Sequence, residues 1–337
     1  MSLDTLQAEL IPLIESNLQA HLETQDFGNS QALRNMMTYH MGWEDEIGSG
    51  KRIRPLLTLL LALAFGAKLE SAMPGAVAIE YLHNFTLVHD DIEDQSPLRH
   101  GRQTLWRIWG IPQAINAGDA LFCLAQLAIL NLEQTSGERI ALKASRRFNQ
   151  VCFKLTQGQY LDIAFEGNQD ISLETYLEMI KGKTGALIAF SAELGGIIAG
   201  KEVIVLNLLR DYGLSLGIAF QVMDDILGIW GDPAVTGKSS ASDILAKKKT
   251  LPVIYGLEHC PEFKSLWKEN NLSPKRVAEL ADILNSCGAQ DYAKQIAQKE
   301  TQKAFQNLKQ LFPENHEHSI YQKTIFELSE RLLARQW

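Results

Sequence analysis

The sequence predicts an all-α fold, and two observations support this. Apolar residues recur every three or four positions along most of the 337 residues, as they do on the buried face of a helix. Signals for strands are almost absent, because no Asn-Gly or Asp-Gly turn separates alternating segments. A chain of this length with 46% hydrophobic residues has ample material for a core. Since no break is long enough to be an interdomain linker, we expect a single domain over residues 1–337.

The predicted helices follow one another along the chain. Residues 3–18 carry Leu or Ile on one helical face and predict an amphipathic first helix. Segments 55–64, 75–91 and 118–132 are so apolar that we expect other helices to bury them nearly all round. Turn residues such as Gly48-Ser49-Gly50 separate these segments. From about residue 262 to residue 337 the sequence is more charged and predicts peripheral helices.

Composition excludes several classes of protein. The net charge of -8 repels polyanions, so we expect no nucleic acid partner. The longest apolar run, around residues 56–65, is too short to span a bilayer, and the first residues lack the features of a signal peptide. The four cysteines lie far apart without a CxxC pair, which argues against a zinc site or a disulfide framework. We therefore expect a cytoplasmic protein without a transmembrane segment.

The strongest chemical signal is a pair of carboxylates near residue 90. At 100° per residue, His83, Thr86, Asp90 and Asp94 fall on one face of a helix. Carboxylates one turn apart on a largely apolar helix repel each other unless a cation or several donors compensate. Paired aspartates without a cysteine or histidine cage favour Mg²⁺ over Zn²⁺. The alternative interpretation is a solvated acidic helix end.

A second apolar segment repeats this arrangement, beginning at Phe220 and ending in Asp224 and Asp225. Two such helices facing each other could hold several metal ions across one cavity. Basic residues accompany both acidic segments: Lys51, Arg52, Arg54, Arg99, Arg102, Lys183, Lys238, Lys247, Lys248 and Lys249. Alternating negative and positive groups suit a substrate whose diphosphate oxygens are shared between Mg²⁺ and cationic side chains.

From about Gly50 to Pro252 the chain resembles the trans-isoprenyl diphosphate synthases, or polyprenyl synthetases. Residues 50–55 resemble the GKRxRP motif of that family, residues 90–94 match its first DDxxD motif, and residues 158–162 resemble its GQxLD segment. The resemblance implies an isoprenoid-synthase-type helical bundle around a central cavity. It also implies that the catalytic motifs lie within residues 50–252.

The resemblance assigns roles to individual residues. The residues expected to bind isopentenyl diphosphate are Lys51, Arg54 and His83. The residues expected to carry Mg²⁺ are Asp90, Asp94 and Asp224, supported by Asp91 and Asp225. The residues expected to bind the allylic diphosphate are Arg99, Lys183, Thr184, Gln221, Lys238 and Lys248.

Two positions depart from the family pattern. Gly228 stands where the second aspartate motif usually has another Asp, so one carboxylate of that motif is missing. His100 stands where the family usually has a second Arg that helps bind isopentenyl diphosphate, and a neutral imidazole is a weaker phosphate ligand.

The reaction implied by the resemblance is a head-to-tail condensation. An allylic diphosphate ionises, and the double bond of isopentenyl diphosphate attacks the resulting carbocation. Phe85 lies roughly 7.5 Å before Asp90 along the predicted helix. In the family an aromatic residue there limits chain length, and its combination with the small Thr86 resembles geranylgeranyl diphosphate synthases. We expect a C20 product, with C15 as the next candidate.

Two other functions remain open. The altered second motif suggests a class I terpene cyclase, although such an enzyme needs no second diphosphate site like that of Lys51, Arg54 and His83. Gly228 and His100 also suggest a catalytically weak subunit of a heteromeric synthase. The family pattern is a homodimer, and residues 116–132 are a candidate interface.

Overall fold

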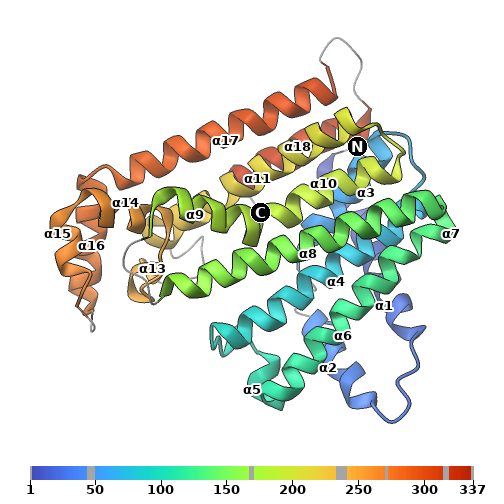
Figure 1. The fold of residues 1–337 in the computed structure, drawn as a ribbon, viewed down its shortest axis with the longest axis horizontal. Helices are drawn as coiled ribbons and strands as arrows, with labels where there is room; N and C mark the ends of the chain where they lie inside the picture. Colours follow the sequence, from blue (N-terminus) through green and yellow to red (C-terminus); the bar gives the residue numbers. More distant parts are fainter. Residues whose placement is uncertain are drawn as a thin grey trace. The chain divides into compact units, whose positions relative to one another are not determined.

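The computed structural model describes residues 2–43, 50–166, 171–232, 241–269, 272–313 and 319–334. Its elements, labelled in Figure 1, are almost all helices, as the sequence predicts. They are α1 (Leu3–Glu23), α2 (Gln31–Met41), α3 (Ile53–Ala64), α4 (Leu69–Glu93), β1 (Leu98–Arg99), β2 (Arg102–Gln103), α5 (Leu105–Trp109), α6 (Ile111–Leu130), α7 (Leu132–Ser136), α8 (Glu138–Glu166), α9 (Leu173–Ile180), the π-helix η1 (Lys181–Gly185), α10 (Ala186–Ile198), α11 (Val203–Trp230), α13 (Ser242–Leu245), α14 (Leu251–His259), α15 (Pro261–Leu266), α16 (Pro274–Ser286), α17 (Ala289–Leu311) and α18 (Ile320–Ala334).

The chain divides into two compact units. The first unit comprises residues 1–150, 190–209 and 314–328, and the second comprises residues 151–189, 210–313 and 329–337. Four helices, α8, α10, α11 and α18, contribute residues to both units. We describe each unit by itself.

In the first unit, α4 packs chiefly against α6 and α3, and α1 covers α4 and α3. The amphipathic first helix is confirmed, because its leucines at 3, 6, 10, 18 and 22 and Ile14 are buried while the residues between them are mostly exposed. In α3, all residues from Pro55 to Ala62 are buried, as their apolar sequence predicts. A helix without a polar face is stable only inside other helices, and α3 therefore lies in the core of this unit.

The expectation that 118–132 is buried nearly all round is wrong. On α6, Leu127 is 44% exposed and Leu130 is 50% exposed, although both are apolar. Periodicity cannot reveal this, since a helix that is apolar on every side has no face that marks solvent. Two segments, 111–136 and 203–230, are long and apolar enough to cross a membrane by length and composition alone. About half of each is buried within the protein, and core helices of soluble proteins pass the same test.

A short hairpin is the β-structure that the sequence did not predict in the described residues. β1 and β2 pair antiparallel, with Arg99 opposite Arg102, and His100 and Gly101 make the turn at positive φ. Two residues per strand are too few to show an alternating pattern, so nothing marked this segment as β-structure.

In the second unit, α14 packs against α9, α15, α16 and α17. One apolar cluster, which includes Tyr176, Val222 and Leu251, packs α9 and α14 against the C-terminal half of α11. Another, which includes Ile229, Phe263 and Leu280, joins α11 to α15 and α16. Helices α15, α16 and α17 therefore contribute buried residues to the core of this unit.

Candidate functional site

A cavity of about 420 Å³ opens in the first unit between α2, α3, α4 and the β1–β2 hairpin. Its walls include Lys51, Arg54 and His83, the three residues expected to bind one diphosphate. Other cationic or ionisable side chains along the same walls are His40, Arg52, Glu80, Asp91, Arg99, His100 and Arg102. A cavity with this excess of cationic groups suits an anionic ligand.

Arg54 and His83 are in direct contact on one wall of the cavity. Arg54 Nη1 lies 3.0 Å from His83 Nε2. Because a guanidinium only donates, the imidazole nitrogen must accept, so His83 is neutral here. Burial, with Arg54 next, lowers the pKa of His83 well below its ordinary value. Arg54 Nε is buried and has no hydrogen-bond partner among the described residues, which leaves a donor available to an anion.

Arg52 has a structural role, although it belongs to the same motif. It adopts a positive φ of 44° and turns its side chain inward, where it is nearly fully buried. Its guanidinium lies 2.6 Å from both Glu15 on α1 and Glu80 on α4. A buried charge needs such partners, and the two ion pairs fix the start of α3 against α1 and α4. This position lets the flanking Lys51 and Arg54 reach the cavity.

The first aspartate motif lies at the C-terminal end of α4, which ends at Glu93 with Asp94 as its cap. Arg99 Nε donates to both carboxylate oxygens of Asp91 at 3.0 Å, and Nη2 lies 2.8 Å from Oδ1. The same guanidinium is only 3.8 Å from Asp90 Oδ2. Asp91, expected as a supporting metal residue, therefore holds Arg99 in place beside Asp90.

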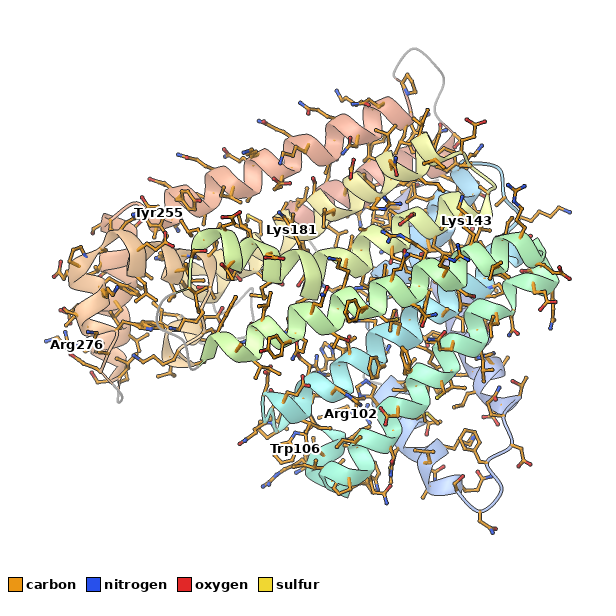
Figure 2. All side chains as sticks on the ribbon, in the orientation of Figure 1. Arg102, Trp106, Lys143, Lys181, Tyr255 and Arg276 are labelled. Atoms are coloured by element: carbon orange, nitrogen blue, oxygen red, sulfur yellow. The ribbon has the colours of Figure 1, made fainter. Side chains whose placement is uncertain are left out.

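The β1–β2 hairpin positions Arg99 and His100 at the cavity. Arg102 stacks over the ring of Tyr39 at 3.9 Å and donates to the Tyr39 carbonyl oxygen at 2.9 Å. Trp106 Nε1 donates to the carbonyl oxygen of Ser96, which precedes β1. Figure 2 labels Arg102 and Trp106 close together at one end of the first unit. These contacts tie the hairpin to α2 and α5.

The second aspartate pair lies on α11 in the second unit. Asp225 is buried and accepts hydrogen bonds from Tyr176 Oη, from Gln221 Nε2 at 3.2 Å and from the backbone N–H of Leu251 at 2.8 Å. Burial raises the pKa of Asp225 to about 6, and these donors oppose that rise. Three donors therefore engage the two carboxylate oxygens of Asp225.

Three of the residues expected at the allylic diphosphate, Lys183, Thr184 and Gln221, lie in the second unit, whereas Arg99 lies at the cavity of the first. Thr184 Oγ1 donates to Gln221 Oε1 at 2.8 Å, and Gln221 in turn bonds Asp225. Lys183 Nζ lies 2.5 Å from Asp162 Oδ2, at the end of the GQxLD segment. Sequence reasoning placed these residues on separate motifs, and the structure brings them together.

A π-helical turn sets the position of Lys183. η1 replaces one turn of α-helix at residues 181–185, a distortion that often occurs at functional sites. A Cβ on Gly158 would lie 2.6 Å from the carbonyl carbon of Gly182 and 2.8 Å from Cα of Lys183. The glycine of the GQxLD segment is therefore required because α8 and η1 approach backbone to backbone.

Gly228, the missing aspartate of the second motif, faces another carboxylate. A Cβ on Gly228 would lie 2.5 Å from Cγ of Asp243 and closer still to Oδ2, whereas real Cβ atoms essentially never approach within 3.0 Å. The carboxylate of Asp243, on α13, thus fills the space of a side chain at 228. Sequence reasoning missed Asp243, because it lies 15 residues after Gly228 and outside the motif.

Two lysines of the expected allylic set lie after this motif. Lys248 is exposed, and its backbone N–H donates to the carbonyl oxygen of Asp243 at 2.9 Å. Lys238 lies outside the described residues. The neighbouring Lys247 points elsewhere, since its Nζ donates to the carbonyl oxygen of Trp267 at 2.6 Å.

The residues expected to limit chain length lie on α4 in the first unit. The Phe85 ring lies 5.0 Å from the ring of Phe122 on α6, and Phe148 and Phe190 continue the aromatic row. Thr86 Oγ1 donates to the His83 carbonyl oxygen at 2.7 Å. Removing the Phe85 ring would therefore expose another ring rather than open solvent.

The carboxylates fit Mg²⁺ better than a metal that needs a complete protein cage. Within the described residues, no three Cys, His, Asp or Glu side chains converge as a metal-binding set. Mg²⁺ usually takes one or two carboxylates and completes its shell with water and substrate phosphate oxygens. Asp90 and Asp94 in the first unit are carboxylates that would suit it, and Asp224 in the second unit is another.

Comparisons with known proteins support the resemblance. Residues 31–287 match the family model described as polyprenyl synthetase. A (2E,6E)-farnesyl diphosphate synthase of Mycobacterium bovis is 43% identical over 233 residues, and the match covers 67% of this chain and 64% of that protein.

Solved structures extend the similarity over nearly the whole chain. The geranylgeranyl pyrophosphate synthetase from Pyrococcus horikoshii is 32% identical with a TM-score of 0.90, covering 99% of this chain and 98% of that one. The geranylgeranyl pyrophosphate synthase from Corynebacterium glutamicum, complexed with isoprenyl diphosphate and magnesium, is 25% identical with a TM-score of 0.84, and all of both chains is covered. The chain described here belongs to the polyprenyl synthetase family.

Proposed function

We propose that this chain is a short-chain trans-prenyltransferase that condenses isopentenyl diphosphate with an allylic diphosphate. The observation that carries the proposal is that side chains suited to binding a diphosphate occur in both units. Lys51, Arg54 and His83 line one cavity of the first unit. Lys183 and the Thr184–Gln221 pair lie in the second unit. An enzyme that joins two diphosphate substrates needs both sets.

The proposed mechanism requires no protein nucleophile. The C–O bond of the allylic diphosphate breaks, and the double bond of isopentenyl diphosphate attacks the carbocation. Arg99 and Lys183 stabilise the departing diphosphate in a site closed to water. Bound Mg²⁺ supplies further charge stabilisation of the leaving group. The released diphosphate takes the final proton, since none of the motifs places a candidate base beside the new cation.

Asp90, Asp94 and Asp224 are the proposed metal-binding residues. Asp243 is added to this set, because its carboxylate occupies the space that a side chain at 228 would fill. This substitution of one carboxylate for another argues against reading Gly228 as a sign of lost activity. The magnesium-bound relative from Corynebacterium glutamicum supports the choice of metal.

The proposed product is geranylgeranyl diphosphate, with farnesyl diphosphate as the next candidate. The aromatic Phe85 one to two turns before Asp90 limits the length of the growing chain, while the small Thr86 leaves room beside it. The compared relatives include a farnesyl and two geranylgeranyl diphosphate synthases. The two products differ by one five-carbon unit.

The proposed assembly is a cytoplasmic homodimer. A stripe of exposed apolar side chains on α6 supports it: Ile111, Ile115, Leu127 and Leu130. Apolar patches of this kind commonly mark subunit interfaces. The same stripe lies on the helix whose residues 116–132 the sequence marks as a candidate interface.

Product analysis tests the proposal against its alternatives. The purified chain is incubated with Mg²⁺, isopentenyl diphosphate and a geranyl or farnesyl diphosphate primer, and the dephosphorylated products are separated by chromatography. We expect a C20 alcohol. A cyclic hydrocarbon formed from the primer alone would identify a terpene cyclase, and activity only after addition of a second protein would identify a weak subunit.

A further inference from the structure

The cavity of the first unit contains a histidine that no motif includes. His40 lies near the C-terminal end of α2 and lines the cavity together with Lys51, Arg54 and His83. Its Nε2 is enclosed and has no hydrogen-bond partner among the described residues. A buried polar atom without a partner calls for an explanation, and a missing ligand is one.

The hydrogen bonds around His40 fix its tautomer. Asn84 Nδ2 donates to the carbonyl oxygen and to Oε1 of Glu80, both at 2.8 Å. Asn84 therefore has only its Oδ1 left for its hydrogen bond with His40, and that oxygen accepts. Since Nε2 has no partner, the donor is Nδ1–H. In the neutral ring Nε2 is then an unprotonated lone pair.

Cationic groups surround this lone pair. Burial, and then the nearby Arg99, Arg52 and Arg102, lower the pKa of His40 to about 3, while the bond to Asn84 opposes them. Some of this charge is already paired, because Arg52 bonds Glu15 and Glu80 and Arg99 bonds Asp91. The other ionisable groups on the cavity walls, whether paired or not, are Tyr39, Lys51, Arg54, His83, His100 and Arg102.

An anion entering the cavity reverses the local electrostatics. Its negative charge offsets the guanidinium groups and favours a proton on the nearest neutral base. His83 is a poor acceptor for that proton, because its Nε2 already accepts from Arg54. Among the described residues, no hydrogen-bond donor occupies His40 Nε2.

We infer that His40 is a further binding residue for the substrate diphosphate in this cavity, taking a proton from solvent at Nε2 and then donating a hydrogen bond to a phosphate oxygen. Proton uptake would turn a neutral ring into a cation only when the anion is present. It would supply the positive charge that His100 lacks relative to the arginine usual in the family. The inference rests on the proposed function only for the identity of the ligand as isopentenyl diphosphate.

Proton linkage in calorimetry tests the inference. Inorganic pyrophosphate is titrated into the protein without Mg²⁺ at pH 7.5, in two buffers with different ionisation enthalpies. The buffer dependence of the heat gives the number of protons taken up. We expect wild-type protein to take up more protons than His40→Gln, because the ionisation of the ligand is common to both. Glutamine cannot take a proton in this range.

A matched control uses another partly buried histidine. His21 bonds the Leu124 carbonyl oxygen at 3.2 Å and lies outside the cavity walls. We expect His21→Gln to retain the proton uptake of the wild type. Equal uptake by wild type and His40→Gln would overturn the inference, as would the absence of pyrophosphate binding by the wild type.

Kinetics separate a binding role from a structural one. We expect His40→Gln to raise the KM for isopentenyl diphosphate about tenfold, with the KM for the allylic substrate and kcat nearly unchanged. Proton linkage without any condensation activity would overturn the proposed function but leave the inference standing. Condensation activity with unchanged linkage in His40→Gln would overturn the inference alone.

Wild-type spectroscopy keeps the inference testable if His40→Gln does not fold. In protein labelled with ¹⁵N-histidine, one of the eight imidazoles should change from a neutral ring to an imidazolium when pyrophosphate is added at constant pH. A spectrum in which every imidazole keeps its protonation state would overturn the inference.

Discussion

At the scale of single residues, the two aspartates of each pair differ in their surroundings. Asp91 is held by Arg99, and Asp225 by Tyr176 and the Leu251 backbone. Their neighbours, Asp90 and Asp224, are the proposed metal ligands. The sequence identifies both pairs but cannot tell which aspartate of each pair is engaged by other protein groups. Adjacent identical residues differ only in the side chains that the fold brings to them.

Restoring the family aspartate at 228 should harm this protein. Because the Asp243 carboxylate occupies that space and would have to rotate away, we expect Gly228→Asp to lower kcat/KM at least about tenfold and to destabilise the fold by less than about 1 kcal/mol. The double variant Gly228→Asp/Asp243→Gly should recover most of both losses. Steady-state kinetics and urea denaturation check this, and a single variant more active than wild type would refute it.

Shortening Phe85 should lengthen the product. We expect Phe85→Ala to add at least one five-carbon unit to part of the product, and Phe85→Ala/Phe122→Ala to add more, because Phe122 is the next ring in the row. Phe65→Ala serves as a control. Phe65 caps α3 shortly before α4 begins at Leu69, and Phe85 lies roughly 24 Å further along α4 from that start. Chromatography of dephosphorylated products gives the answer, and an unchanged distribution in both variants would count against the prediction.

At the scale of elements, two helices depart from what their sequences suggest. The apolar α6 leaves several leucines and isoleucines exposed, and η1 interrupts a helical run with a π-turn at Lys183. The π-turn leaves no sequence signal except the glycines that permit the close approach of α8. The exposed apolar stripe on α6 can be tested as a dimer interface by mutation.

A charge on α6 should disrupt the proposed dimer. We expect Leu127→Glu to shift the protein from dimer to monomer at micromolar concentration, because a buried unpaired carboxylate is costly. Ile204→Glu is the matched control, since Ile204 is 73% exposed at the start of α11 and lies off the stripe. Sedimentation velocity distinguishes the two, and a wild type that is monomeric would remove the basis of this prediction.

At the scale of the whole molecule, the sequence predicts the helices well and the contacts between distant residues poorly. The amphipathic first helix and the apolar α3 follow from spacing and composition. The pairing of Gly228 with Asp243, and of His40 with Asn84, depends on how the chain folds back on itself. No periodic pattern records such contacts. The spacing of the aspartates and the nearby basic residues marked the chemistry of the site in advance, and the family resemblance added the roles of individual residues.

Buried neutral histidines should make the fold sensitive to acid. The pKa of His40 is about 3 in the folded chain and about 6.5 when unfolded, so below pH 6.5 the unfolded chain binds a proton that the folded chain does not. Stability is therefore lost as pH falls below 6.5. We expect the stability advantage of wild type over His40→Gln to be about 1 kcal/mol smaller at pH 5.5 than at pH 7.5. Urea midpoints measure this, and an advantage independent of pH would contradict it.

Two-substrate steady-state kinetics is the most direct test of the central claim that the chain binds two diphosphates at separate sets of side chains. We expect Arg54→Ala to raise the KM for isopentenyl diphosphate at least about tenfold and to leave the KM for the allylic substrate nearly unchanged. Lys183→Ala should do the reverse. If both variants raised the KM for the same substrate, or if neither affected isopentenyl diphosphate, the assignment of two sites would be wrong.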